Sequence, residues 1–217
     1  MTSLGWRYVL GEFRTEILTG SLPLAADVAA RAAVLPGADG HLRMDVRSDR
    51  LILWLQTPEM AWVTAEDIDL ARRISALAEE FRLTTRGGVG ERSRSVQGLE
   101  IAIDAMDAGA IRPFWKAALG YVEEHGTSGA TGALVDPLGE GPAIWFQQMD
   151  APRPQRNRMH VDITVAHDEA AARLAAALAA GGTMVRDAEA PAYWVVADAE
   201  GNEACICTWQ NRDERGV

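Results

Sequence analysis

Long apolar runs are absent from this sequence, and their absence excludes one class of protein. No stretch of about 18 apolar residues occurs, which is the length that a helix needs to cross a bilayer. The N-terminal stretch MTSLGWRYVLGEFRTE has no basic segment followed by an apolar core, so we expect no signal peptide. We therefore expect no membrane partner.

Cysteine is also scarce in this sequence, and basic residues are fewer than acidic ones. Lysine and arginine number 21 against 31 acidic residues, which gives a formal net charge of −10. A surface of this sign repels phosphate backbones, so nucleic acid is not an expected partner. Cys205 and Cys207 are the only cysteines. Their spacing in an extended run puts both on one face of a strand, where a mutual disulfide would be strained, and two reduced thiols indicate a cytoplasmic location.

The composition is that of a globular protein with two small domains. Hydrophobic residues make up 48% of the 217 residues and charged residues 24%. The segment TTRGGVGERSRSVQG is polar, rich in glycine and arginine, and without hydrophobic periodicity, which indicates a linker. We predict a first domain at residues 1–84, a linker at 85–97 and a second domain at 98–217.

The first half alternates between strand and helix patterns. Residues 6–17 predict a strand or hairpin, 23–34 an alanine-rich helix, and 42–56 two strands joined by a turn. Thr64 is a favourable N-cap for the helix that follows, and Asp67 stands at the capping-box position.

The second half contains the same order of elements twice, namely strand, helix and three strands. Superposing the two copies aligns Glu100 with His160 and Ala143 with Glu203, both at an offset of 60 residues. Such a repeat predicts one supersecondary unit used twice. Two units together can close a curved sheet around a central cavity.

The runs HVDITVAHDEAAARLAAALAAGG and ADAEGNEACICTW make this half similar to the glyoxalase, or vicinal-oxygen-chelate, superfamily. The resemblance implies that ligands come from the first and last strand of each copy, at Glu100, Ala143, His160 and Glu203. Ala143 cannot bind a metal, whereas the other three suit a divalent ion such as Zn²⁺, Mn²⁺, Fe²⁺ or Ni²⁺. Glu203 is also a candidate catalytic group, because a spare carboxylate can move a proton.

The same residues allow a structural interpretation, because a shift of one residue in register turns every side chain to the other face of a strand. Aromatic residues on or near the predicted cavity strands could stack on a flat ligand; they are Trp145, Phe146, Tyr193, Trp194 and Trp209. The resemblance therefore implies a metal-dependent lyase, isomerase or dioxygenase that acts on a small oxygenated or planar substrate. The alternative is a protein that sequesters a small molecule without chemistry, as the bleomycin-binding relatives do.

The stretch HLRMDVRSDRLILWLQTPEMAWVTAEDIDLARRISALA resembles the pterin-4a-carbinolamine dehydratases without gaps. Of the histidines typical of that family, His41 is retained, whereas Gly40 and Pro58 replace the other two. Leu42 replaces the family's proline, and the helix acid is retained as Asp67. Dehydration needs groups that donate and accept protons near neutral pH, a property typical of histidine. The loss of two histidines predicts a degenerate module.

Together the two resemblances imply an α+β protein. The first domain is expected to be an antiparallel sheet with helices on one face, and the second a paired βαβββ domain. A working dehydratase that uses His41 and Asp67 remains a third alternative. Because dehydratases of this family assemble through their sheets and helices, a homodimer is expected.

Overall fold

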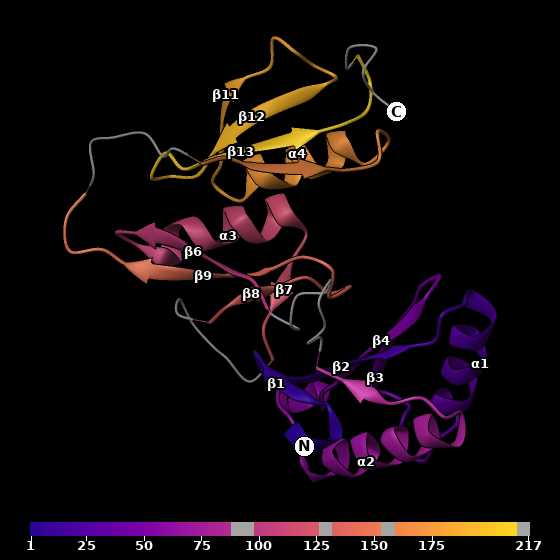
Figure 1. Cartoon of the computed structure of the whole chain (residues 1–217). Coiled ribbons are helices and arrows are strands. Elements are labelled where there is room, and N and C mark those ends of the chain that lie inside the picture. The colour runs from indigo at the N-terminus through magenta and orange to yellow at the C-terminus, as the bar shows by residue number, and fades with distance from the viewer. Residues whose placement is uncertain (88–97, 126–131, 153–158, 212–217) are drawn as a thin grey trace. The chain divides into compact units, whose positions relative to one another are not determined.

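The computed structural model describes residues 1–87, 98–125, 132–152 and 159–211. The chain divides into two compact units, Met1–Gly98 and Leu99–Val217 (Figure 1). Both units mix helices with sheets, which confirms the α+β prediction. Within the described ranges, no helix is both long and apolar enough to span a membrane.

The first unit is an antiparallel sheet in the order β1-β2-β4-β3, with β5 paired to β2. Its strands are β1 (Arg7–Val9), β2 (Glu12–Leu18), β3 (Leu42–Val46), β4 (Arg50–Leu55) and β5 (Thr85–Arg86). Its helices are α1 (Leu22–Ala33) and α2 (Ala65–Glu80), and two short 3₁₀ turns lie at Thr2–Leu4 and Pro58–Met60.

Strand alternation decides which face of this sheet is buried. Leu51, Leu53 and Leu55 point to one face and are completely buried. They pack against apolar residues of α1 and α2, including Val28, Leu70 and Ile74. Both helices therefore cover one face of the sheet.

Two details of the first unit bear on the sequence predictions. Thr64 and Asp67 form the predicted capping box at the start of α2. Thr85–Arg86, which the sequence predicts to be the start of the linker, instead pair with β2 as β5. This two-residue pairing rests on backbone hydrogen bonds and has no hydrophobic pattern of its own, so it cannot be predicted from the sequence. The rest of the predicted linker, residues 88–97, lies outside the described residues.

The second unit contains the predicted duplication. Its two four-stranded sheets have the orders β6-β9-β8-β7 and β10-β13-β12-β11, and in each the first and last strands of the copy pair in parallel. The first copy consists of β6 (Glu100–Ala105), α3 (Ala108–Leu119), β7 (Val122–Glu123), β8 (Leu134–Val135) and β9 (Ala143–Gln148). The second consists of β10 (Val161–Thr164), α4 (Ala170–Ala179), β11 (Thr183–Arg186), β12 (Tyr193–Ala197) and β13 (Glu203–Cys207).

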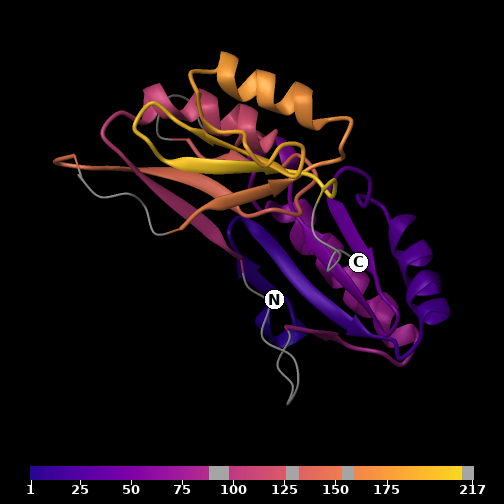
Figure 2. The ribbon, with the colours of Figure 1, turned by 90° about the horizontal axis from the view of Figure 1, so that it is seen from above.

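The two copies share one hydrophobic core, and α3 and α4 lie side by side (Figures 1 and 2). Gly120 ends α3 in the left-handed region at φ 71°, and a Cβ there would lie 2.8 Å from the guanidinium of Arg173 on α4. Arg173 in turn donates a hydrogen bond to the carbonyl of Ala118. Glycine at this position thus permits the close approach of the two helices.

The turn between β12 and β13 joins the second copy to the first. The indole N–H of Trp115 on α3 donates to Oδ2 of Asp198 at 2.9 Å, and both residues are buried. The carboxylate of Glu200 accepts the backbone N–H groups of Met106 and Asp107, directly before α3. Much of the ADAEGNE motif therefore has a structural role.

Asp198→Ala should destabilise the second unit, because it leaves the buried indole N–H of Trp115 without its acceptor. We expect a loss of about 1–3 kcal/mol in the free energy of unfolding. Hydrogen exchange of α3 peptides against urea would measure it. Exposed Asp168, changed to Ala, is the matched control and should cost less than about 0.5 kcal/mol. Equal effects of the two substitutions would contradict this assignment.

Candidate functional site

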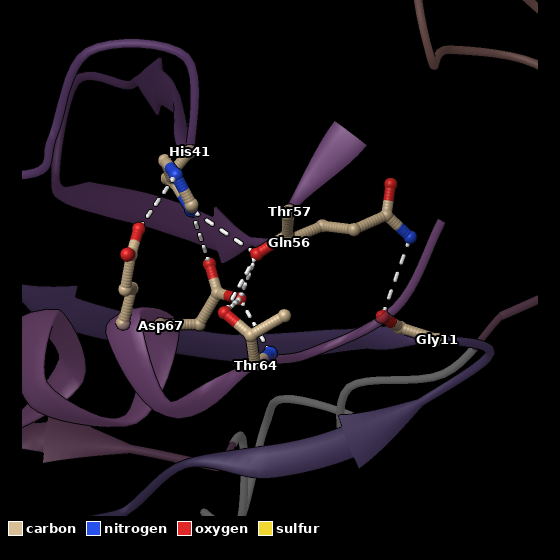
Figure 3. Close-up of polar contacts among 7 residues, drawn as sticks. Gly11, His41, Gln56, Thr57, Thr64 and Asp67 are labelled. Carbon is tan, nitrogen blue, oxygen red and sulfur yellow. Dashed lines mark hydrogen bonds and ion pairs between the residues drawn. The ribbon is translucent and has the colours of Figure 1, made fainter. Parts of the chain in front are cut away.

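Two of the predicted site residues meet in the first unit. Nδ1 of His41, just before β3, lies 2.9 Å from Oδ1 of Asp67 in the first turn of α2 (Figure 3). An ionised carboxylate only accepts hydrogen bonds, so Nδ1 carries the hydrogen in this contact. This hydrogen bond orients the imidazole ring and leaves Nε2 as the nitrogen that can bind a ligand or transfer a proton.

Asp67 is completely buried and well supplied with donors. Its Oδ2 accepts hydrogen bonds from the backbone N–H of Thr64 at 2.7 Å and from the hydroxyl of Thr57 at 2.7 Å. Burial by itself raises the pKa of Asp67, but the hydrogen bonds from Thr64, His41 and Thr57 outweigh it and hold the pKa below its usual range. The carboxylate therefore stays ionised at neutral pH and keeps the ring in position.

Nε2 of His41 lies near the carboxylate of a second acidic residue, Glu66. Oε2 of Glu66 is 3.5 Å away, and the Glu66 side chain is 77% exposed. A small cavity of about 140 Å³ adjoins the ring; it is lined by Glu12, Gly40, His41, Leu42, Arg43, Trp54, Gln56 and Pro58. This arrangement supplies a positioned imidazole next to a space that admits only a small group.

The second unit carries a larger hollow on the β10–β13 sheet. Its volume is about 1190 Å³, and its lining includes His160, Asp162, Tyr193 and Glu203. Asp162 pairs with Cys205 across the parallel strands β10 and β13, which brings both side chains to the same face. The hollow thus combines an aromatic ring, an imidazole and three carboxylates, the third of them from Glu189.

The cysteines of β13 also line this hollow. Burial, together with the neighbouring carboxylate of Asp162, raises the pKa of the Cys205 thiol to about 12. The thiol therefore stays protonated at neutral pH, and the two cysteines form no disulfide, as the sequence predicts. A charged pair, Arg186 with Glu189, forms part of the rim.

Comparison with known proteins identifies the second unit. The sequence model of a family described as "Glyoxalase-like domain" matches residues 100–207. Residues 100–207 are a glyoxalase-like domain. A search of curated proteins finds no match to the chain.

Solved structures similar to this chain cover about half of it. One is a glyoxalase/bleomycin resistance protein/dioxygenase family enzyme from Burkholderia phytofirmans, with 18% identity, a TM-score of 0.41, and coverage of 50% of this chain and 95% of the other. A glyoxalase-related enzyme from Fulvimarina pelagi has 19% identity, a TM-score of 0.39, and coverage of 53% and 88%. A glyoxalase/dioxygenase from Nostoc punctiforme has 14% identity, a TM-score of 0.39, and coverage of 50% and 88%.

The predicted metal ligands of the glyoxalase-like domain are only partly brought together. His160 and Glu203 line the same hollow, whereas Glu100 is exposed and is not part of that lining. Glu100 pairs across its own sheet with Ala143, which offers no ligand atom. Among the residues that the structure describes, no three His, Cys, Asp or Glu side chains form a group that could hold a metal ion. These residues do not fit a resident metal, and the metal site stays a prediction.

Sequence reasoning missed some contributors to both sites. Of the five aromatic residues expected near the cavity, Tyr193 is the one in the lining of the hollow. In the first unit, Thr57 and Glu66 contact the His41–Asp67 pair. Glu66 precedes the capping acid, but its approach to Nε2 depends on where the β3 strand begins, which no local pattern reveals. The catalytic roles of His41, Asp67 and Glu203 remain predictions.

Asp67→Asn should destabilise the first unit in a pH-dependent way. Because folding lowers the pKa of Asp67, its ionised form stabilises the fold above the unfolded-state pKa of about 3.9, and this contribution is lost as pH falls through the lower folded-state pKa. We expect a cost of about 1–3 kcal/mol at neutral pH that shrinks below about pH 4. Urea unfolding followed by hydrogen exchange of α2 measures it.

Asp69→Asn on the same helix is the control, because Asp69 is exposed and paired with Arg72. It should change the free energy of unfolding by less than about 0.5 kcal/mol. A cost for Asp67→Asn that does not vary with pH would contradict the electrostatic account.

Proposed function

We propose that the glyoxalase-like domain binds a small oxygenated or planar molecule in the hollow of the β10–β13 sheet. The observation that carries this proposal is the lining, in which Tyr193 lies with His160 and Glu203. An aromatic ring stacks on flat ligands, and carboxylate and imidazole groups accept hydrogen bonds from hydroxyls. A volume of about 1190 Å³ leaves ample room for such a ligand.

Binding of such a molecule without chemistry is better supported than the activity of a metal-dependent lyase, isomerase or dioxygenase. A metal of that kind stabilises negative charge on two adjacent oxygens of the substrate. Of the predicted ligands, the hollow brings together His160 and Glu203, and among the described residues no three His, Cys, Asp or Glu side chains are grouped closely enough to hold such an ion. The proposal therefore includes no step through a metal.

Tyr193→Leu and Glu203→Gln should each weaken ligand binding, because one removes the stacking ring and the other a charged acceptor. A panel of flat phenols and hydroxyketones, titrated by calorimetry, should include ligands whose affinity falls about tenfold in each variant. Trp209→Leu is the control, since Trp209 is 68% exposed and outside the lining. Affinities that both variants leave unchanged would rule out this hollow as the binding site.

Two further measurements separate the binding form from the enzymatic one. Product formation from any bound ligand would assign catalysis to the domain. A full equivalent of a transition metal in the purified protein, lost in the His160→Ala variant, would restore the metal-dependent form.

A second function, proton transfer by His41 in a dehydratase-type reaction, is favoured by the contact with Asp67. The buried carboxylate fixes the ring tautomer, as a base-orienting group does in other acid–base sites. Gly40 and Pro58, where the similar family has histidines, leave His41 as the imidazole in the cavity lining. We therefore expect dehydration at His41 to be slower than at a site with three histidines.

His41→Ala should lower the rate of 4a-hydroxypterin dehydration by about 10²–10⁴-fold relative to the unchanged chain. Stopped-flow absorbance of the quinonoid product measures this rate. His125→Ala is the matched control, since His125 is exposed in a turn of the other unit. A wild-type rate equal to that of buffer alone would exclude the dehydratase proposal.

A further inference from the structure

The sheet of the first unit has a polar face opposite its helices. Arg14 of β2 pairs with Trp54 of β4, which pairs in turn with Arg43 of β3. The neighbours of Trp54 along β4, Leu53 and Leu55, are buried toward the helices. Strand alternation therefore turns Arg14, Trp54 and Arg43 to the opposite face, side by side.

Arg43 combines two contacts on this face. Its guanidinium lies over the ring of Trp54, 4.7 Å from the centroid. One of its nitrogens, Nη2, is 3.3 Å from Oε1 of Glu12, and the Arg43 side chain remains 41% exposed. Stacking on the indole holds the planar guanidinium in place while its edge stays open to solvent.

The carboxylate of Glu12 makes its closer contacts with a different arginine, Arg14. Nη2 of Arg14 lies 2.9 Å and its Nε 3.0 Å from Oε2 of Glu12, and both side chains are largely buried. The contact from Arg43 is a single, longer one to the other oxygen. A carboxylate from a ligand can therefore replace Glu12 at Arg43 without leaving Glu12 unpaired.

The cavity beside Arg43 has both apolar and polar walls. Trp54, Pro58 and Leu42 give it apolar walls, and Glu12, His41 and Gln56 give it polar ones. The side-chain nitrogen of Gln56 donates to the carbonyl of Gly11 at 3.3 Å, while its oxygen is directed away from Gly11 (Figure 3). A side-chain amide oxygen in this position can accept a hydrogen bond from a ring N–H.

We propose that this cavity binds a small flat ring compound that carries a carboxylate, and that Arg43 binds that carboxylate. A guanidinium fork matches the two oxygens of a carboxylate in one plane. At about 140 Å³ the cavity is smaller than the usual ligand pocket of about 300–1,000 Å³, so it encloses one ring system and leaves the charged group at the rim. The inference concerns binding, and it requires neither proton transfer by His41 nor a ligand in the glyoxalase-like domain.

The test compares a charged and a neutral probe of nearly the same shape, quinoline-2-carboxylate and quinoline-2-carboxamide, on the ¹⁵N-labelled full chain. We expect the carboxylate to bind about tenfold more tightly, which corresponds to about 1.4 kcal/mol. Shifts of the Gly40 amide and the Trp54 indole N–H would locate it in this cavity. Arg43→Gln should remove the preference, and Arg43→Lys should retain part of it.

Arg47→Gln is the matched control, because Arg47 is an exposed arginine close to β3 that pairs with Asp45 outside the cavity. It should leave the preference for the carboxylate unchanged. Equal affinity for the two probes, a preference that survives in Arg43→Gln, or no shift of Gly40 and Trp54 at millimolar carboxylate would each overturn the proposal. His41→Asn should still prefer the carboxylate, so a failed dehydratase assay and a failed binding assay are distinguishable.

Discussion

A single buried carboxylate connects the fold of the first unit to its site. Asp67 closes the capping box that begins α2, and the same side chain accepts hydrogen bonds from Thr57 after β4 and from His41 before β3. A charge without solvent is tolerated only when donors surround it, and here these donors come from three separate segments. The start of the helix, the end of one strand and the beginning of another are therefore fixed relative to one another.

The two copies in the second unit share one topology, but their outward-facing residues differ. Both copies pair their first and last strands in parallel, yet the large hollow is lined by residues of the second copy and its C-terminal extension. The second copy has His160 and Glu203 where the first has Glu100 and Ala143. Because backbone hydrogen bonds and core packing define the fold, the outward-facing positions of each copy are free to differ.

The features that the sequence predicts are those that depend on neighbours in the chain or on a repeated pattern. The Thr64–Asp67 capping box is a local motif, and the offset of 60 residues aligns the strands of the two copies. Other features depend on which strands pair. The stacking of Arg43 on Trp54 follows from the β3–β4 register, and Glu100, which belongs to the other sheet, is absent from the lining that contains His160. The hydrophobic periodicity of the sequence predicts neither the strand register nor the arrangement of the two sheets.

The turn that follows β12 makes the two copies of the second unit depend on each other. Asp198 and Glu200 belong to the second copy, yet their partners, Trp115 and the backbone before α3, belong to the first. The first copy, expressed alone, would therefore leave the indole N–H of Trp115 and the backbone N–H groups of Met106 and Asp107 without these acceptors. A single copy would need a second chain to supply the same groups, whereas the duplicated chain makes these contacts within one molecule.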